Sequence, residues 1–305
     1  MESALSANPS EQTNPRVLAL RNLWPSECLS VGLFVFLAFL AALRHNTASH
    51  VSILLAIAAL LFSSAILEAH YSTPLTRILR EWLSLCVILL AYWSIEWFAT
   101  PTKIESLQNL WLGWDRALLE HYGLRGAIES LGAVIPFTVE IAHLMLYIVP
   151  PIALIALQLA GNRSDRRQFL YTLFLGTFSV YALLPLIAVE SPRRVFPHQD
   201  EPRIVTAPRQ INTYLLNHMD ISTGVFPSGH VAVAYSTAFG LLGFATRRSR
   251  SLGLPIAAFV MGTLVYLATI YGRYHYAVDG LASIAIAAAA WLFTQNRKWS
   301  VSDEV

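Results

Sequence analysis

Long apolar runs constrain the fold of this chain more than any other feature. Each run has about the 20 residues that a helix needs to cross roughly 30 Å of hydrocarbon. Their richness in Leu and Ala favours helices over strands. The chain is 13% charged, whereas soluble domains average about 25%. We therefore predict an all-α polytopic membrane protein, with eight spans at roughly residues 26–43, 51–68, 82–100, 136–159, 168–188, 227–246, 252–271 and 275–295.

The spans predict a domain organisation. We expect a six-helix core that follows two additional N-terminal transmembrane helices, with a tail at each end. The core contains one segment of a different kind, where apolar residues such as Trp111 and Trp114 recur at helical spacing between polar residues. That pattern is typical of an amphipathic helix in the membrane interface. The predicted parts are the tail at 1–25, the two helices at 26–80, the core at 81–295 with its interfacial segment at 101–135, and the tail at 296–305.

Basic residues predict the orientation. The short loops around 160–167 and 245–251 are dense in arginine, and such loops resist translocation. We therefore expect both termini in the cytoplasm, with the connection at 189–226 on the extracytoplasmic side of a plasma (inner) membrane. The net charge of +2 is too small to indicate a nucleic-acid partner. The two cysteines, Cys28 and Cys86, lie in or beside apolar segments, where buried unpaired thiols are expected.

The first polar cluster is Pro227-Ser228-Gly229-His230, at the start of an apolar run. Proline is favoured in a first helical turn, serine suits an early-turn position, and glycine lets a ligand approach the backbone. Free N–H groups at a helix start attract anions. The segment therefore predicts an anion site with His230 beside it as a proton donor. A capped helix entry with a polar histidine is the structural alternative.

The second cluster places His275 four residues before Asp279. Residues four apart share one helical face, so the carboxylate can accept a proton from one ring nitrogen. The other nitrogen is then free as a nucleophile. Arg273, Arg193 and Arg194 supply fixed positive charge suited to a phosphoryl group. The predicted topology brings all these residues to the same face of the membrane.

At these residues the chain resembles the type 2 phosphatidic acid phosphatase superfamily, which also includes bacterial acid phosphatases and vanadium haloperoxidases. The resemblance covers roughly residues 80–295. It implies that His275 attacks phosphorus, that Asp279 orients it and that His230 protonates the leaving oxygen. By the same resemblance the phosphoryl oxygens would be held by Arg193, Arg194, Ser228, Gly229 and Arg273.

Two motifs depart from the usual family pattern. No lysine stands seven residues before Arg193 or Arg194; these positions are Leu186 and Ile187. Arg273 lies two residues before the histidine, whereas the family usually places its arginine six before. These forms resemble the branch that contains fungal inositol phosphorylceramide synthase, which passes a phosphoryl headgroup to another alcohol. The acceptor of the phosphoryl group can therefore be water or a lipid hydroxyl.

The resulting expectation is a membrane-embedded hydrolase that removes phosphate from a lipid phosphate or polyprenyl diphosphate through a phosphohistidine. A lipid phosphotransferase is the first alternative and a non-enzymatic anion or lipid transporter is the second. No metal or other cofactor is implied, because the histidines lack a carboxylate-rich shell and arginines repel cations. The partners are the lipid phosphate and membrane lipids. Glu140 and His143 lie within a predicted span, where ionisable residues often face a cavity, so they are candidates for a substrate cavity.

Overall fold

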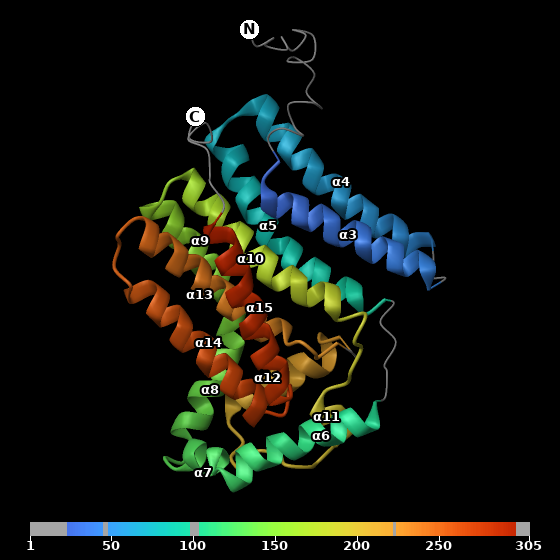
Figure 1. The fold of residues 1–305 in the computed structure, drawn as a ribbon, viewed down its shortest axis with the longest axis vertical. Helices are drawn as coiled ribbons and strands as arrows, with labels where there is room; N and C mark the ends of the chain where they lie inside the picture. Colours follow the sequence, from blue (N-terminus) through green and yellow to red (C-terminus); the bar gives the residue numbers. More distant parts are fainter. Residues whose placement is uncertain (1–22, 45–47, 98–103, 222–223, 297–305) are drawn as a thin grey trace. The chain divides into compact units, whose positions relative to one another are not determined.

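The computed structural model describes residues 23–44, 48–97, 104–221 and 224–296. Every regular element in these ranges is a helix (Figure 1), which confirms the predicted all-α class. The predicted tails at 1–25 and 296–305 lie almost entirely outside the described residues.

The chain forms two compact units, Met1–Ala91 and Tyr92–Val305. The division falls within helix α5 (Pro74–Ile95). This helix begins earlier than the predicted span at 82–100, because the polar residues after Pro74 continue the helix beyond its apolar part. The predicted start of the core, at residue 81, lies in the same helix.

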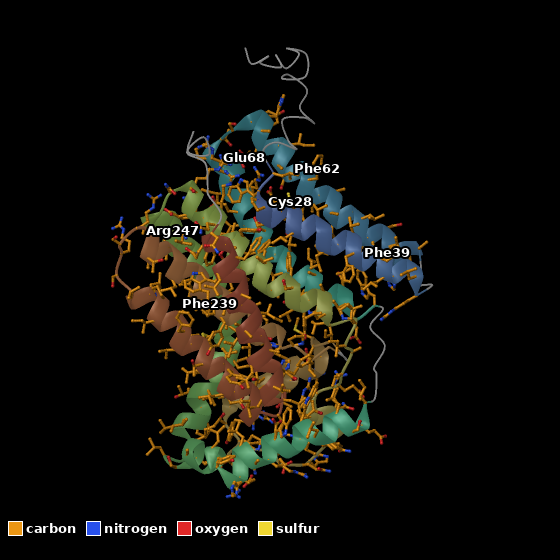
Figure 2. The ribbon with its side chains drawn as sticks, viewed as in Figure 1. Cys28, Phe39, Phe62, Glu68, Phe239 and Arg247 are labelled. Atoms are coloured by element: carbon orange, nitrogen blue, oxygen red, sulfur yellow. The ribbon has the colours of Figure 1, made fainter. Side chains whose placement is uncertain are left out.

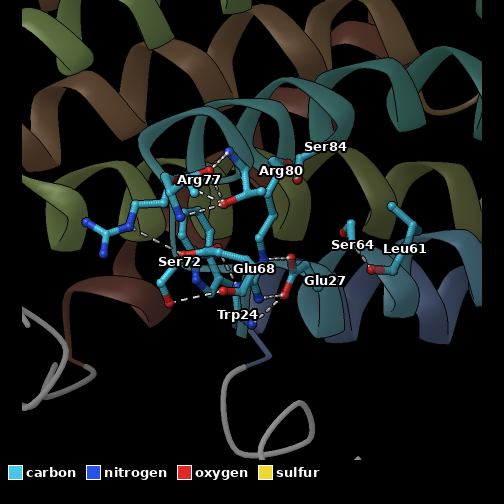
Figure 3. A network of polar contacts seen from close by, with 11 residues as sticks. Trp24, Glu27, Leu61, Ser64, Glu68, Ser72, Arg77, Arg80 and Ser84 are labelled. Atoms are coloured by element: carbon cyan, nitrogen blue, oxygen red, sulfur yellow. Dashed lines mark hydrogen bonds and ion pairs between the residues drawn. The ribbon is translucent and has the colours of Figure 1, made fainter. Parts of the chain in front are cut away.

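The first unit contains α3 (Pro25–Leu43), α4 (Ala48–Tyr71) and most of α5. A buried ionic network joins the three helices (Figure 3). Arg80 binds Glu27 through Nη2 at 2.5 Å and Glu68 through Nη1 at 2.8 Å. Each buried charge thus has a partner, and loss of one partner would leave an uncompensated charge.

The first unit exposes many large apolar side chains, as a lipid-facing surface must. Phe39, which is labelled on α3 in Figure 2, is 59% exposed. Cys28 and Cys86 form no disulfide in the described part of the chain, and both are exposed, so the expectation that they are buried is wrong. An apolar run does not reveal which of its faces meets lipid and which meets protein.

The second unit is built around α13 (Gly229–Arg247), which packs against α10 (Arg163–Leu183), α14 (Gly253–Tyr271) and α15 (Ala277–Gln295). Phe239 of α13 stacks on Trp291 of α15, with ring centroids 5.4 Å apart. Close approach of α13 to α10 depends on Gly176, where an added Cβ would lie 2.1 Å from Ser236 Oγ. The remaining predicted span of this unit contains two helices, α8 (Val134–Met145) and α9 (Val149–Ala160).

Each of the eight predicted spans overlaps helical structure, although the last residues of the span at 82–100 lie outside the described residues. Six helices in the described residues are long and apolar enough to cross a membrane. Val134–Ala160 counts as one of these six, although a short 3₁₀ turn interrupts it at Leu146–Ile148. The other two predicted spans, α10 and α13, are long enough but more polar. Most of their residues are buried against neighbouring helices, so they need less apolar surface toward lipid.

Four further α-helices of the described residues lie outside the predicted spans: α6 (Glu105–Arg116), α7 (Leu124–Glu129), α11 (Pro192–Val195) and α12 (Ala207–His218). The predicted amphipathic helix is α6. It buries Trp111 and exposes Leu110 and Trp114. In Figure 1, α6 and α7 lie at the same end of the second unit as α11 and α12.

Candidate active site

Three distant segments of the second unit meet through their backbones. The N–H of Val225 donates to the carbonyl of Val189 at 3.2 Å. The N–H of Arg193 donates to the carbonyl of Arg273 at 3.3 Å. The N–H of Ser228 donates to the carbonyl of Asp279 at 3.1 Å. These contacts bring together the two histidine motifs and the segment that contains Arg193 and Arg194.

His275 lies in the turn that precedes α15. Its Nδ1 lies 2.9 Å from the carbonyl oxygen of Val225 and 3.4 Å from Oδ2 of Asp279. Both neighbours are acceptors, so Nδ1 carries the hydrogen. The unprotonated Nε2 then has a free lone pair, as a nucleophile requires.

The structure corrects one detail of the predicted pairing. His275 and Asp279 do not share a helical face, because α15 begins only at Ala277. The turn nevertheless brings the two side chains together. Asp279 also accepts the Tyr276 N–H through Oδ2 at 2.9 Å, which stabilises the first turn of α15. Its buried Oδ1 has no hydrogen-bond partner among the described residues.

His230 is the second residue of α13 and faces His275. The two rings have centroids 5.7 Å apart, and His230 Nδ1 lies 3.5 Å from His275 Nε2. Ser228 is the N-cap of α13, and its Oγ accepts the Val231 N–H at 3.4 Å. Gly229 has little free space, since an added Cβ would lie 3.1 Å from the Tyr181 ring. The motif thus forms the helix entry that the sequence predicts.

The three predicted arginines have different surroundings. Arg193 binds Asp220 through Nη2 at 2.8 Å and Asn217 through Nη1 at 2.8 Å. Arg194 is exposed. Arg273 is 1% exposed, and its Nε and Nη2 have no hydrogen-bond partner among the described residues. Nε and Nη2 form one edge of the guanidinium, the arrangement that contacts two oxygens of an anion.

A third histidine lies against the pair. The His143 ring stacks on His230, with centroids 4.8 Å apart and an interplanar angle of 25°. His143 Nδ1 lies 3.1 Å from Oδ1 of Asn212. The Asn212 amide nitrogen donates to both the carbonyl and Oε2 of Glu140, at 2.9 and 2.7 Å. Because this fixes the amide orientation, Oδ1 is an acceptor and His143 Nδ1 carries the hydrogen.

Glu140 also joins the site to the turn before α15. The Tyr274 hydroxyl donates to Glu140 Oε2 at 2.7 Å. Arg209 Nη1 donates to the Gly272 carbonyl at 2.6 Å and lies 3.3 Å from Glu140 Oε1. Burial raises the pKa of Tyr274 well above its usual value; Arg209 opposes this and Glu140 reinforces it. The hydroxyl therefore remains a donor at ordinary pH.

A pocket of about 380 Å³ opens beside this turn. Tyr274 connects its wall to His143, since their ring centroids are 4.8 Å apart. Three guanidinium groups line it against one carboxylate, which suits a polar or anionic group. The lining residues are Arg193, Arg194, Glu201, Arg209, Thr213, Asn217 and Tyr274.

Several residues of the site were not predicted from the sequence. Asn212 and Arg209 belong to the long connection, where no motif marks them. The Val225 contact uses a backbone carbonyl, which any residue would supply. Asp115 is in the predicted amphipathic helix, but its contact with Arg273 joins residues 158 positions apart. Only its burial on the inner face of α6 distinguishes it from the other charged residues there.

Comparison with known proteins gives one match. Residues 167–301 match the model of the family described as the PAP2 superfamily. The matched range contains both histidine motifs and the Arg193–Arg194 pair, but it begins after α6 and α8. No curated protein and no solved structure was found to match the chain significantly.

Proposed function

We propose, from the match of residues 167–301 to the PAP2 superfamily, that the protein is a membrane hydrolase acting on a lipid phosphate or polyprenyl diphosphate. The observation that carries the proposal is the His275–His230 pair. Its facing nitrogens are 3.5 Å apart, and the Nδ1 contacts of His275 leave its Nε2 unprotonated.

The proposed reaction has two steps. In the first, His275 Nε2 attacks phosphorus, an N–P bond forms and the P–O bond to the leaving group breaks. His230 gives its proton to the leaving oxygen, a contribution of about 10²- to 10⁴-fold in rate. In the second step, water attacks the phosphohistidine, His230 accepts the proton of the water, and phosphate leaves with the N–P bond broken.

Fixed charge would stabilise both transition states. The free edge of Arg273 is suited to two phosphoryl oxygens, and the start of α13 places backbone N–H groups beside His230. Such preorganised donors act strongly in a water-poor site. Asp279 and the Val225 carbonyl would stabilise the His275 ring while it carries the phosphoryl group.

A phosphotransferase is the second candidate, and the pocket beside Tyr274 favours it. A lipid alcohol needs space near the phosphohistidine, and Tyr274, which directly precedes His275, lines this pocket. The pocket volume of about 380 Å³ falls within the range of small-molecule sites, about 300–1,000 Å³. In this case the second step would pass the phosphoryl group to the alcohol oxygen.

The test is phosphate release by the purified full-length protein. The substrates are phosphatidic acid, a polyprenyl diphosphate and a phospholipid with an inositol headgroup, each with and without a lipid alcohol. Phosphate release without alcohol supports the hydrolase, and a phosphorylated alcohol supports the transferase. A wild-type protein that binds these lipids without converting any of them would favour the transporter alternative and refute both enzymatic proposals.

The proposal extends to location. The membrane spans support an integral membrane protein, and the arginine-rich loops favour cytoplasmic termini. The active site would then face the extracytoplasmic side of the plasma (inner) membrane and act on lipids of that leaflet.

A further inference from the structure

Helix α6 contacts both histidine motifs through its buried face. The Trp111 ring stacks on Phe226, directly before the first motif, with centroids 5.1 Å apart. Its other neighbour is Tyr276, directly after His275, at 5.4 Å. The opposite face of the helix is open, with Trp114 51% exposed. The helix is therefore packed against the site rather than attached only by its ends.

One charged residue of α6 reaches the turn that carries His275. Asp115 Oδ2 lies 2.8 Å from Nη1 of Arg273. Its Oδ1 accepts the N–H of Ala277, the first residue of α15, at 2.9 Å. A carboxylate at this position also interacts favourably with the positive end of the helix dipole. Asp115 thus contacts the side chain of Arg273, two residues before His275, and the backbone of Ala277, two residues after His275.

The contact with Arg273 determines what that arginine can bind. Asp115 takes Nη1 alone, and the edge formed by Nε and Nη2 stays without a partner in the described part of the chain. Arg273 has φ 61°, a left-handed backbone that is unfavourable for a residue with a side chain. Such a conformation persists when its surroundings hold it, and the ion pair with Asp115 is one such restraint.

We propose that Asp115 is a positioning residue of the active site, which orients the Arg273 guanidinium toward the phosphoryl group and fixes the start of α15 beside His275. Asp115 itself contacts no substrate. The inference rests on the proposed function for the identity of the phosphoryl group, but its geometry uses only contacts within the protein. It adds α6, outside the matched family region, to the parts that the site requires.

The main test compares Asp115→Asn with Asn109→Ala in the full-length protein. Asn109 is an exposed residue of the same helix, so its replacement should leave activity unchanged. Asparagine keeps the shape of Asp115 but loses its charge and one acceptor. We expect kcat to fall about 100-fold, the size of effect that misplaced groups produce, with a much smaller change in KM. Wild-type kcat for Asp115→Asn would overturn the proposal.

A double substitution separates positioning from simple stabilisation. If Asp115 acts through Arg273, adding Asp115→Asn to Arg273→Ala should lower kcat by less than about threefold. A full further 100-fold loss would show that Asp115 acts independently of Arg273 and overturn the proposal. If Asp115→Asn does not fold, Asp115→Glu takes its place, because it keeps the charge and displaces the carboxylate by one methylene.

A binding measurement distinguishes failure of this inference from failure of the proposed function. Vanadate resembles phosphate, and its affinity can be measured by thermal shift without turnover. We expect Asp115→Asn to weaken vanadate binding about tenfold in the wild-type background and to leave it unchanged in Arg273→Ala. Unchanged or stronger binding in the wild-type background refutes the positioning role, even if the wild type hydrolyses every lipid phosphate. Absence of turnover with intact vanadate coupling would refute only the proposed function.

Discussion

Replacement of Asn212 by Leu tests the network that holds the third histidine. Asn212 donates two hydrogen bonds to Glu140 and accepts one from His143, and all three residues are buried. A buried hydrogen bond contributes about 1 kcal/mol, and one to a charged group about 1.5–3 kcal/mol. Leucine has nearly the same shape, so the loss is chiefly polar and should be about 3–5 kcal/mol.

This destabilisation should be visible in thermal unfolding. In a unit of this size each kcal/mol lowers the midpoint by about 2–4 °C, so Asn212→Leu should unfold about 10 °C below wild type. The His143 ring would also lose its fixed orientation against His230, and kcat should fall about tenfold. The matched control is Gln210→Leu, an exposed position on the same helix, which should change neither quantity. A midpoint within about 2 °C of wild type and full activity would refute the assigned amide orientation and the tautomer derived from it.

Three further predictions concern packing, the anion site and topology. Gly280→Ala places a Cβ 2.2 Å from the Tyr266 ring and should destabilise the protein by about 1–3 kcal/mol in thermal unfolding. The control Gly126→Ala, whose Cβ would have no atom within 4 Å, should be neutral or stabilising. Equal unfolding midpoints for the two variants would contradict the packing of α14 on α15. Vanadate should inhibit phosphate release and excess chelator should not, because arginines and helix-start amides bind the phosphoryl group; activity lost in chelator and restored by a divalent cation would refute this. The topology test uses single cysteines at Gln199 or Ser249 in a protein without Cys28 and Cys86. An impermeant thiol reagent applied to intact cells should label position 199 and not position 249, because the loop at 245–251 resists translocation. The reverse labelling would place the active site in the cytoplasm.

The helices were predictable because a single physical requirement determines them. A segment must be apolar over about 20 residues to cross the hydrocarbon, and that requirement is visible in the sequence without tertiary information. The ends of the helices were less predictable. α5 begins at Pro74 because polar residues can extend a helix beyond its apolar part. α10 and α13 are more polar than the other spans, since neighbouring helices cover them.

The histidines of the site were predictable because each lies at the start of an apolar run, so the topology alone places them together. The contacts that hold these histidines in place were not predictable. The Val225 carbonyl that accepts from His275 has no sequence signal, since every residue has a carbonyl. Asn212 lies in a connection whose helix, α12, is not among the candidate membrane spans of the described residues. Contacts of this kind depend on tertiary packing and become visible only in the structure.

The most direct test of the account is where the phosphoryl group becomes attached during turnover. Wild type, His275→Ala and His230→Ala would be mixed with a radiolabelled phosphate ester that has a good leaving group, and quenched within one turnover. We predict an acid-labile label on His275 in the wild type, a longer-lived label in His230→Ala, because no base activates the water, and none in His275→Ala. A label on another residue, or unchanged turnover in His275→Ala, would contradict the proposed mechanism.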